Sequence, residues 1–452
     1  MNFPLPNQVL WLFHQFQASG YELFLVGGCV RDMLLGRPVH DYDFTTNATP
    51  DEMTRFLENT SCKVIATGKQ HGTLTILYQS EAMEVTTYRL EPAYVKHRRP
   101  DHVVFTKDLI SDLSRRDFTI NAMAYHPDHG LVDPYDGQKD LKDQIIRCVG
   151  VGEERMEEDA LRILRALRFS FELHFSMDFM CIEAIKKKAS LLTHISKERI
   201  RDEWNRMLLS DAKQLLRSLH DVGVLPYIIP QISMIESLTQ ENPWHIYDVF
   251  THTDIALDHS EGMGLCEKLA IIFHDFGKAQ CKSFDENHQA HFYGHAKISA
   301  EIAIVALQEM KYSNKLIDRV AALIAFHDYP LSPKVKMLRR LLAKLNVDYE
   351  LAHSILQVQY ADDCAKNNVY AAKKLAANTA CQRLLENMKK EDSMLKRADL
   401  AVSGNDLIAL GYQGKQIGEW LNKLYRIVVD DPSLNQREEL LKKVINTDND
   451  RI

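Results

Sequence analysis

The pattern of apolar and polar positions changes once along the chain, near residue 150. Before that point, short runs with strand-like alternation and β-branched content are separated by helical segments. The strand-like runs are YELFLVGG, DYDFTT, CKVIATG, GTLTILY and MEVTTYR, all between residues 21 and 89. Between them, TPDEMTRFLEN predicts a helix that Thr49 caps and Pro50 begins. After residue 150, apolar residues recur at helical spacing, as in EEDALRILRALRFSFEL, and strand signals vanish.

These patterns predict an α+β fold, in which a small mixed α/β unit at the N-terminus is followed by helical segments alone. Turn-forming residues near 210–245, 329–333 and 430–435 interrupt the helical part. We therefore expect four domains, at residues 1–148, 149–215, 216–365 and 366–452.

Composition narrows the classes of function and the cell compartment. The net charge of −7 argues against bulk binding of nucleic acid, so any such contact must come from local basic patches. The eight cysteines lie far apart without a C-x-x-C pair, which is typical of reduced thiols and predicts a cytoplasmic protein. No run of 18 apolar residues occurs, and the first residues lack the basic region of a signal peptide. We expect neither membrane insertion nor secretion.

Residues 26–48, VGGCVRDMLLGRPVHDYDFTTNA, carry the first candidate chemistry. If DYDFTT is a strand, Asp41 and Asp43 lie on one face and can share one or two divalent ions. Gly27 and Gly28, at a strand-to-helix turn, would let a triphosphate approach bare N–H groups beside Arg31. Phosphate on one side and metal on the other is the arrangement that nucleotidyl transfer requires.

A third carboxylate comes from Glu84 in EVTTYR, if its strand lies beside the first. Taken alone, the same residues also fit a solvated strand end and a plain turn, and this alternative stays open until the neighbouring motifs are considered.

The motifs that accompany this stretch carry a family resemblance. In order they are G-G-x-V-R-D, D-Y-D, TGKQHGT, EVTTYR, RRP (98–100), DLSRRDFTINAMA (112–124), DPYDG (133–137) and EEDALRILRALRF. The series closely resembles the class II tRNA nucleotidyltransferases, the CCA-adding enzymes and their bacterial poly(A) polymerase relatives. The resemblance covers at least residues 21–209, with a softer continuation from DLAVSGNDLIALGYQGKQIG onwards. It implies a nucleotidyltransferase head (1–148), a base-selecting neck (149–215), a helical body and a tRNA-binding tail (366–452).

The resemblance implies catalytic roles for Asp41, Asp43 and Glu84, with Mg²⁺ held by the two aspartates. Expected nucleotide contacts are Gly27, Gly28, Arg31, Arg116, Arg165 and Arg168 for the triphosphate or sugar, and Asp117 and Asn121 for the ribose hydroxyl.

Base selection is expected from Asp159 and Arg162, which sit at i and i+3 if this segment is helical. An acceptor beside a donor matches the amino group and ring nitrogen of cytosine or adenine, and opposes uracil and guanine. The segment also fits an ordinary amphipathic helix with i,i+3 ion pairs, and both interpretations can hold together. In the family that this chain resembles, CC-adding enzymes have a shortened loop where this chain has RLEPAYVKHRRPDHVVF. The resemblance therefore implies full CCA addition over CC addition, and it does not exclude an A-adding enzyme.

A second candidate site lies in the helical half. LCEKLAIIFHDFGKA places His274 and Asp275 at the end of an apolar helix, with His252 upstream and His291 and His295 downstream. This series resembles the HD phosphohydrolase superfamily, and the resemblance implies an HD domain at 216–365 whose metal ligands are His252, His274, Asp275 and Asp362. Mixed imidazole and carboxylate ligands suit Mn, Fe, Ni or Zn. Histidines satisfied within a degenerate HD fold are the alternative.

Two basic stretches without acidic residues are candidates for RNA contact. They contain Lys334, Lys336, Arg339 and Arg340, and Lys373 and Lys374, although either stretch also fits a solvated helix face. The sequence therefore predicts a CCA-adding tRNA nucleotidyltransferase with tRNA, CTP and ATP as partners and no stable protein partner. The alternatives are an A-adding enzyme, a poly(A) polymerase, an HD-type hydrolase acting on RNA ends or nucleotides, and a non-enzymatic RNA-binding regulator.

Overall fold

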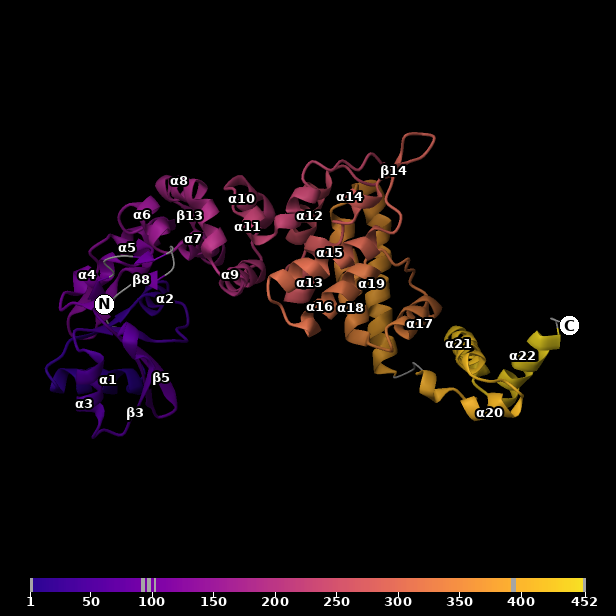
Figure 1. Cartoon of the computed structure of the whole chain (residues 1–452), viewed down its shortest axis with the longest axis horizontal. Coiled ribbons are helices and arrows are strands. Elements are labelled where there is room, and N and C mark those ends of the chain that lie inside the picture. The colour runs from indigo at the N-terminus through magenta and orange to yellow at the C-terminus, as the bar shows by residue number, and fades with distance from the viewer. Residues whose placement is uncertain (1–2, 91–93, 96–98, 101–102, 392–395, 450–452) are drawn as a thin grey trace. The chain divides into compact units, whose positions relative to one another are not determined.

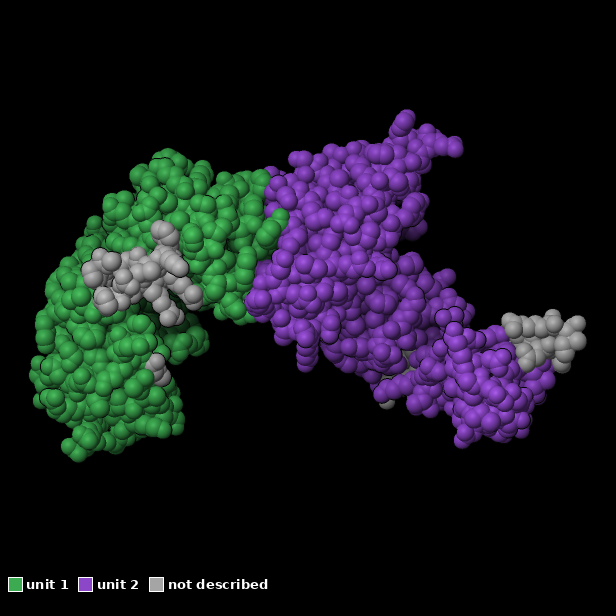
Figure 2. All heavy atoms as spheres, in the orientation of Figure 1, with its two compact units in different colours: residues 1–212, 218–230 green, residues 213–217, 231–452 purple. Residues whose placement is uncertain are grey.

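The computed structural model describes residues 3–90, 94–95, 99–100, 103–391 and 396–449. The chain forms two compact units, coloured separately in Figure 2. Unit 1 contains residues 1–212 and 218–230, and unit 2 contains residues 213–217 and 231–452. The expected mixed α/β region followed by helical regions is confirmed. The finer division into four domains stays a prediction.

A seven-stranded mixed sheet forms the centre of the N-terminal part of unit 1 (Figure 1). Its strand order is β11-β10-β1-β2-β5-β4-β3. The strands are β1 (Leu23–Val26), β2 (Asp43–Thr46), β3 (Lys63–Gly68), β4 (Thr73–Tyr78), β5 (Glu81–Thr87), β10 (Ala124–His126) and β11 (Gly130–Val132). Neighbours in this sheet pair antiparallel except β2 and β5, which are parallel. Short pairs outside the sheet join β6 (Arg89–Leu90) with β9 (Val104–Phe105), and β7 (Tyr94–Val95) with β8 (Arg99–Pro100).

All five strands expected between residues 21 and 89 are present in this sheet. Their alternation explains the burial: in β5, Met83 and Val85 are buried whereas Glu84 between them is exposed. Helix α3 (Pro50–Leu57) has the expected start, because Thr49 and Glu52 form a reciprocal capping box and Pro50 occupies the first turn.

The rest of unit 1 consists mainly of helices, which occur before, between and after the strands in the sequence. They are α1 (Asn7–Ala18), α2 (Gly28–Leu34), α4 (Leu109–Ser114), α5 (Gly137–Asp143), α6 (Gly152–Glu158), α7 (Leu161–Leu173), α8 (Phe179–Lys188), α9 (Lys197–Leu209) and α11 (Leu225–Ile228), with α10 (Leu215–Asp221) at the boundary of the units. Helix α7 packs against α9, where the Trp204 side chain is fully buried. This packing holds the side chains that α7 presents to the candidate site.

Unit 2 is built from helices. They are α12 (Val249–Asp258), α13 (Leu265–Phe273), α14 (Lys278–Cys281), α15 (His295–Glu309), α16 (Asn314–Phe326), α17 (Val335–Lys344), α18 (Tyr349–Cys364), α19 (Asn368–Lys390), α20 (Gly404–Ala409), α21 (Lys415–Asp430) and α22 (Arg437–Asn449). Helix α13 packs against α12, α15, α16 and α18. The C-terminal helices have a small core of their own, which includes Leu407, Leu424 and Leu440.

The expectation that strands are absent after residue 150 is wrong in two places. Ser176–Met177 (β13) pairs in parallel with Ile145–Ile146 (β12), and Ser283–Phe284 (β14) forms a hairpin with Ala290–His291 (β15). Two-residue strands have too few positions to show alternation, so pattern analysis does not detect them. Within the described part of the chain, no helix has the length and apolar character needed to span a membrane.

Candidate active site and His/Asp cluster

Asp41 and Asp43 both line a cavity of about 450 Å³ in unit 1. Asp43 is the first residue of β2, and Asp41 precedes the strand, so the expectation that both stand on one strand is wrong for Asp41. Both nevertheless line the same cavity. Desolvation and repulsion from Glu84 raise the pKa of Asp43, while Arg116 opposes the rise. Crowded carboxylates of this kind favour a bound cation.

Glu84 is a neighbour of Asp43 on the adjacent strand of the sheet. It is the direct partner of Asp43 in the parallel pairing of β2 with β5. Glu84 does not line the 450 Å³ cavity itself. Glu84 is therefore close to the two aspartates but outside the cavity, and its negative charge contributes to the raised pKa of Asp43.

The glycine turn that lines the same cavity lies against a guanidinium group. Gly27 has a φ of 74° at the start of α2, a conformation that side-chain-bearing residues rarely adopt. A Cβ atom at Gly27 would lie 3.1 Å from Arg116 Nη1. Gly28 also lines the cavity. The bare backbone thus leaves room for Arg116 and for a ligand at the turn.

A polar chain fixes the predicted nucleotide-contacting residues relative to one another. Arg31 Nη1 donates to Asn121 Oδ1 at 2.9 Å, and Asn121 Nδ2 donates to Asp117 Oδ1 at 3.2 Å. Asp117 Oδ2 accepts from Arg165 Nε at 2.8 Å. Burial alone would raise the pKa of Asp117, but the guanidiniums of Arg165 and Arg162 lower it to about 2. Asp117 is therefore ionised at neutral pH and holds Arg165 in place.

The ring of Phe169, a residue that the sequence analysis did not single out, contacts the guanidinium groups of three of the arginines. The guanidinium carbons of Arg168, Arg31 and Arg165 lie 4.0, 5.0 and 5.3 Å from the centre of its ring. Phe169 and Arg206 both line the cavity. The signal for Phe169 was its spacing, because position i+4 from Arg165 shares a helix face with it.

The cavity therefore combines two kinds of charge. Asp41 and Asp43 line it, and so do Arg31, Arg116, Arg165, Arg168 and Arg206. Carboxylate oxygens suit a hard divalent cation, and guanidiniums suit phosphate oxygens. A nucleoside triphosphate carrying a divalent ion has charges complementary to both kinds of group.

Asp159 and Arg162 are not in this cavity. Helix α6 ends at Glu158 and α7 begins at Leu161, so the expectation of one continuous helix carrying both residues is wrong. Asp159 Oδ1 accepts from Leu161 N at 3.1 Å, a local bond that starts α7 and interrupts the helix.

The polar groups of both residues have other partners. Asp159 Oδ2 pairs with Arg199 Nη2 at 3.1 Å, and Arg162 Nη1 pairs with Glu158 at 2.6 Å. Arg162 Nη2 also donates to the carbonyl of Arg115 at 2.8 Å. Neither side chain lines the cavity that holds Asp41 and Asp43. Of the long segment at 89–105, residues 91–93, 96–98 and 101–102 lie outside the described residues.

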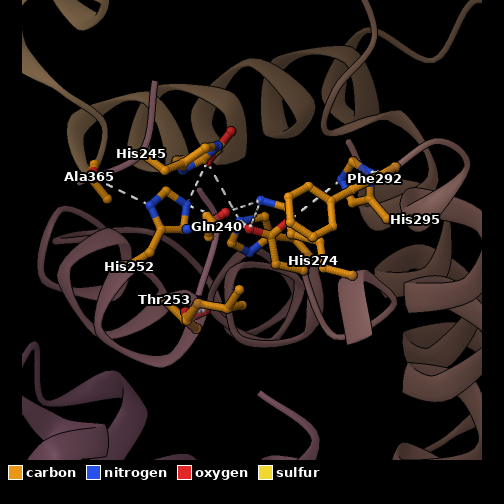
Figure 3. A network of polar contacts seen from close by, with 12 residues as sticks. Gln240, His245, His252, Thr253, His274, Phe292, His295 and Ala365 are labelled. Carbon is orange, nitrogen blue, oxygen red and sulfur yellow. Dashed lines mark hydrogen bonds and ion pairs between the residues drawn. The ribbon is translucent and has the colours of Figure 1, made fainter. Parts of the chain in front are cut away.

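Unit 2 brings the four predicted HD residues together. His252 comes from α12, His274 and Asp275 follow α13, and Asp362 lies near the end of α18. His252 Nε2 lies 2.9 Å from Asp362 Oδ1, and His274 Nε2 lies 3.6 Å from the same oxygen. Figure 3 shows His252 and His295 on either side of His274. The ligand atoms of His252, His274 and Asp362 all lie within 4.8 Å of one another, close enough for one metal ion.

Two lysines flank this cluster. Lys278 Nζ pairs with Asp275 Oδ2 and Lys366 Nζ with Asp362 Oδ2, each at 2.6 Å. Burial opposes ionisation, but Lys366 and the neighbouring histidines hold the pKa of Asp362 well below its usual range. The adjoining cavity has a volume of about 330 Å³ and reaches Asp275, Asp362 and both lysines.

The predicted RNA-contacting residues lie on α17 and α19, except Lys334, which directly precedes α17. Lys334, Lys336, Lys373 and Lys374 are exposed. Lys336 and Arg340 both pair with Asp430 of α21, at 3.1 and 2.6 Å. Lys374 lies 3.6 Å from Asp363. Lys334 and Lys373 are the exposed members for which the structure records no ion pair.

Comparison with known proteins identifies the family. Three family descriptions match in order: the poly A polymerase head domain at residues 23–147, the RNA and SrmB-binding site of polymerase A at 174–235, and tRNA nucleotidyltransferase domain 2 at 285–444. The CCA-adding enzyme of Staphylococcus aureus (strain Newman) is 32% identical over 456 residues, which cover 99% of each chain. This chain belongs to the CCA-adding enzyme family.

Other CCA-adding enzymes are similar to this chain over shorter or equal lengths. That of Lactobacillus delbrueckii subsp. bulgaricus is 44% identical over 219 residues, which span 48% of this chain and 54% of that protein. The crystal structure of the Bacillus stearothermophilus CCA-adding enzyme in complex with CTP superimposes with a TM-score of 0.73 at 27% identity, covering 99% of this chain and 100% of that one. The Thermotoga maritima CCA-adding enzyme complexed with tRNA shares the fold, with a TM-score of 0.59 at 18% identity.

Membership of the CCA-adding family fits the cavity of unit 1. Enzymes of this family use divalent metal ions. Asp41 and Asp43, with Glu84 adjacent, supply the oxygen ligands that such ions prefer.

Proposed function

We propose that this chain is a template-independent CCA-adding tRNA nucleotidyltransferase, which adds C, C and A from CTP and ATP to the 3′ ends of tRNA. The observation that carries the proposal is the single cavity that is lined both by Asp41 and Asp43 and by Arg31, Arg116, Arg165 and Arg168. Homology with CCA-adding enzymes along nearly the whole chain supports the same activity. The solved relative that contains CTP adds support for the nucleotide.

In each addition the 3′-oxygen of the RNA forms a bond with the α-phosphorus of the nucleotide. The bond from that phosphorus to the α,β-bridging oxygen breaks, pyrophosphate leaves, and the hydroxyl proton is released. Mg²⁺ is the ion we propose for Asp41 and Asp43, where it would activate the attacking oxygen and stabilise the leaving group. The arginines bind the triphosphate, and the Gly27–Gly28 turn leaves space for it.

Arg165 and Phe169 organise the nucleotide-binding wall in this proposal. The pairing of Arg165 with Asp117, at 2.8 Å, and the ring of Phe169 restrict where the guanidiniums point. Asp117 and Asn121 are proposed to contact the ribose hydroxyl. Because Asn121 already links Arg31 with Asp117, a sugar bound there would contact a pre-ordered group.

We further propose that Asp159 and Arg162 select the base. For this role Asp159 must leave Arg199 and Arg162 must leave Glu158, since both pairs occupy the groups that would meet a base. The Asp159–Arg199 pair is partly exposed, so exchanging its partner costs little. The Arg162 side chain is only 10% exposed, so its release from Glu158 requires that the base replace the lost hydrogen bonds. Nucleotide choice would then follow from a rearrangement of the α6–α7 junction.

The domain roles follow the expected boundaries. We assign nucleotide transfer to the head (1–148), base selection to the neck (149–215) and tRNA binding to the tail (366–452). The proposed RNA contacts are Lys373 and Lys374 in the tail and, in the domain before it, Lys334, Lys336, Arg339 and Arg340. All eight cysteines are free thiols, in keeping with a reducing cytoplasm. An A-adding enzyme and a poly(A) polymerase remain the alternatives within this reaction class.

A second function is favoured by the His/Asp cluster of unit 2. We propose that His252, His274, Asp275 and Asp362 hold a transition-metal ion (Mn, Ni, Fe or Zn) and that this site hydrolyses phosphate esters at RNA ends or on nucleotides. The ligand atoms of three of these residues lie within 4.8 Å of one another, and Lys278 and Lys366 supply positive charge for a phosphate. The domain at 216–365 would then be an HD domain.

Substitutions in the two units separate the functions. Asp41→Ala should abolish incorporation of CMP and AMP into tRNA, whereas Asp275→Asn should leave incorporation intact and abolish hydrolysis of a 2′,3′-cyclic nucleotide. Asp51→Ala is the matched control, because Asp51 is exposed and pairs with Lys69 outside the cavity. Incorporation that survives Asp41→Ala would contradict the first proposal, and hydrolysis that survives Asp275→Asn would contradict the second.

A further inference from the structure

A cavity of about 690 Å³ lies in unit 2 between helices α17 and α21. The two helices pack against each other, and Figure 1 shows them side by side. Among the described residues, this cavity shares no lining residue with the cavities that contain Asp41 and Asp275, and it is larger than either. It is therefore a separate space, and neither of the sites described above accounts for it.

Helix α21 presents one continuous face to this cavity. The face consists of positions i, i+3, i+4 and i+7, which share one side of a helix. They are Asn422, Tyr425, Arg426 and Val429. Leu424, in contrast, is fully buried in the core of the C-terminal helices. Helix α21 thus has an apolar face that packs in that core and a second face, aromatic and basic, that lines the cavity.

Helix α17 and the segment before it supply the other lining residues. Arg340, Ala343 and Lys344 stand at i, i+3 and i+4 on one face of α17. Tyr329 lies between α16 and α17, and Lys344 Nζ is 4.5 Å from the centre of its ring. Gln359 Nε2 donates to the carbonyl of Tyr329 at 2.9 Å, which fixes the backbone there. Both helix faces therefore bring cationic side chains to the same space, together with tyrosine rings.

Ion pairs connect α17 with α21. Arg340 Nε and Nη2 donate to the two carboxylate oxygens of Asp430 at 2.7 and 2.6 Å, and Lys336 Nζ lies 3.1 Å from Asp430 Oδ2. Helices that pack directly normally fill the space between them with interdigitating side chains. Of the nine described residues that line this cavity, only Ala343 and Val429 are aliphatic. The lining is therefore unsuited to closing the space by apolar packing.

The charges of the lining favour an anionic ligand. Asp430 is already paired with Arg340, so Lys344 and Arg426 leave the cavity with positive charge. Arg426 and Asn422 are exposed, and neither makes a hydrogen bond or ion pair within the part of the chain that the structure describes. Their donor groups are available to a ligand without the loss of a bond to the protein.

The combination of side chains matches a nucleotide. The rings of Tyr329 and Tyr425 offer faces on which a base can stack, and Lys344 and Arg426 can bind its phosphate. The amide of Asn422 can donate to and accept from the edge of a base. A base inside a duplex is covered by its neighbours, so a ligand of this kind must be unpaired.

The position of the cavity favours a nucleotide of an RNA chain over a free one. Arg340 lines the cavity and also belongs to the basic stretch for which RNA contact is proposed. Lys334 and Lys336, in the same stretch, are exposed. An RNA backbone that follows these cationic groups passes beside the cavity, where one of its bases can enter.

We infer that the cavity between α17 and α21 binds one unpaired nucleotide of the tRNA substrate. Its base stacks on the tyrosine rings, and its phosphate contacts Arg426 and Lys344. The inference rests on the proposed tRNA nucleotidyltransferase function and adds a base contact to the phosphate contacts proposed for this surface.

The test measures equilibrium binding of tRNA to the full-length chain across a salt series. Tyr425→Leu should weaken binding by about 5–100-fold, the effect expected for the loss of one stacked base. The slope of log Kd against log salt should stay the same, because no charge is removed. Tyr425→Phe keeps the ring and should bind as wild type does. Arg426→Gln should weaken binding and also reduce the slope by about 1.

Chemical probing of the bases in bound tRNA locates the nucleotide. One unpaired base should be protected by the wild-type chain and become reactive again with Tyr425→Leu. Tyr293→Leu is the matched control, because Tyr293 is an exposed tyrosine of unit 2 outside this cavity, and it should change neither affinity nor protection. Arg426 is exposed, so a weaker complex of Arg426→Gln does not reflect a failure to fold.

The outcomes separate this inference from the proposed function. Unchanged tRNA affinity in Tyr425→Leu and Arg426→Gln, with normal incorporation of CMP and AMP, overturns the inference and leaves the function standing. Unchanged tRNA affinity together with binding of free AMP that Tyr425→Leu abolishes assigns the cavity to a free nucleotide and also overturns it. Binding of tRNA that depends on Tyr425, without incorporation, supports the inference and contradicts the function. A chain that does not bind tRNA contradicts both.

Discussion

Asp43 and Glu84 face each other across the single parallel strand pair of the seven-stranded sheet. Because the two positions are in register, the charge of Glu84 acts directly on Asp43 and contributes to its raised pKa. The acidic wall of the cavity is therefore a property of the strand order and not only of the Asp-x-Asp spacing. The two residues differ in one respect, since Asp43 lines the cavity and Glu84 does not.

This difference predicts unequal effects of substitution. Asp43→Asn should reduce the rate of nucleotide incorporation by more than about a hundredfold, because it removes a carboxylate that faces the metal and substrate. Glu84→Gln should cost about 10–100-fold, as expected for a group that supports a ligand. Single-turnover rates at several Mg²⁺ concentrations measure both, and Glu81→Gln, at the exposed start of β5, is the control. A Glu84→Gln effect equal to that of Asp43→Asn would mean that Glu84 itself contacts the metal.

The Asp117–Arg165 pair should make the stability of the protein depend on pH. The pKa of Asp117 is lowered to about 2 in the folded chain, compared with about 3.9 in an unfolded one. Its ionised form therefore stabilises the fold above about pH 4, by roughly 2–3 kcal/mol, and this contribution is lost as the pH falls toward 2.

Asp117→Asn tests this contribution. It should lower the free energy of unfolding at pH 7, and the gap between wild type and variant should shrink by about half at pH 3. Urea unfolding at both pH values, followed by tryptophan fluorescence, gives the comparison. A gap that is the same at pH 7 and pH 3 would show that Asp117 does not titrate as described.

Base selection should fail when Asp159 is removed. Asp159→Ala should reduce the preference for CTP and ATP over UTP by about 10–100-fold, because one polar contact to the base is lost. The ratios of kcat/KM for the nucleotides provide the measurement. Glu157→Ala is a suitable control, since Glu157 pairs with Lys188 and precedes the α6–α7 junction. If Asp159→Ala lowers all rates equally, its role is confined to holding Arg199.

Binding of tRNA should depend on the lysines that have no recorded ion pair. The double substitution Lys334→Ala and Lys373→Ala should weaken tRNA binding and reduce the salt dependence of log Kd by about 1 for each lost phosphate contact. Arg340→Ala should weaken binding less, because Arg340 is already bound to Asp430. Filter binding across a salt series measures the slopes, with Lys186→Ala on α8 as the control. Unchanged slopes in the double variant would remove these lysines from the interface.

The sequence patterns correctly predicted those strands and helix ends that depend on residues close together in the chain. The five strands between residues 21 and 89 and the capping box of α3 follow from alternation and from local hydrogen bonds. Strands β10 and β11 were missed because each has three residues, too few for a period to be evident. The break at Asp159 was missed because a capping side chain within an apolar-periodic segment does not alter the period.

The sites were predicted less completely, because they depend on contacts between residues that are far apart in the sequence. Most of the expected nucleotide-contacting residues do line one cavity, yet Asp159 and Arg162 are turned to Arg199 and Glu158. His327 belongs to a His-Asp dipeptide of a type that occurs four times, so sequence gave no reason to choose it. Its proximity to Asp275 depends on helix packing around Gly277, which no local pattern reports.

The central claim is tested most directly by the 3′ ends that the purified chain produces. The protein is incubated with tRNA ending at the discriminator base, tRNA ending in CC, or an unrelated RNA, with CTP and ATP supplied separately and together. We predict CC from CTP alone on the first substrate, A from ATP on the second, a complete CCA end when both nucleotides are present, and no extension of the unrelated RNA. Incorporation of ATP only, and only onto tRNA ending in CC, would contradict the account.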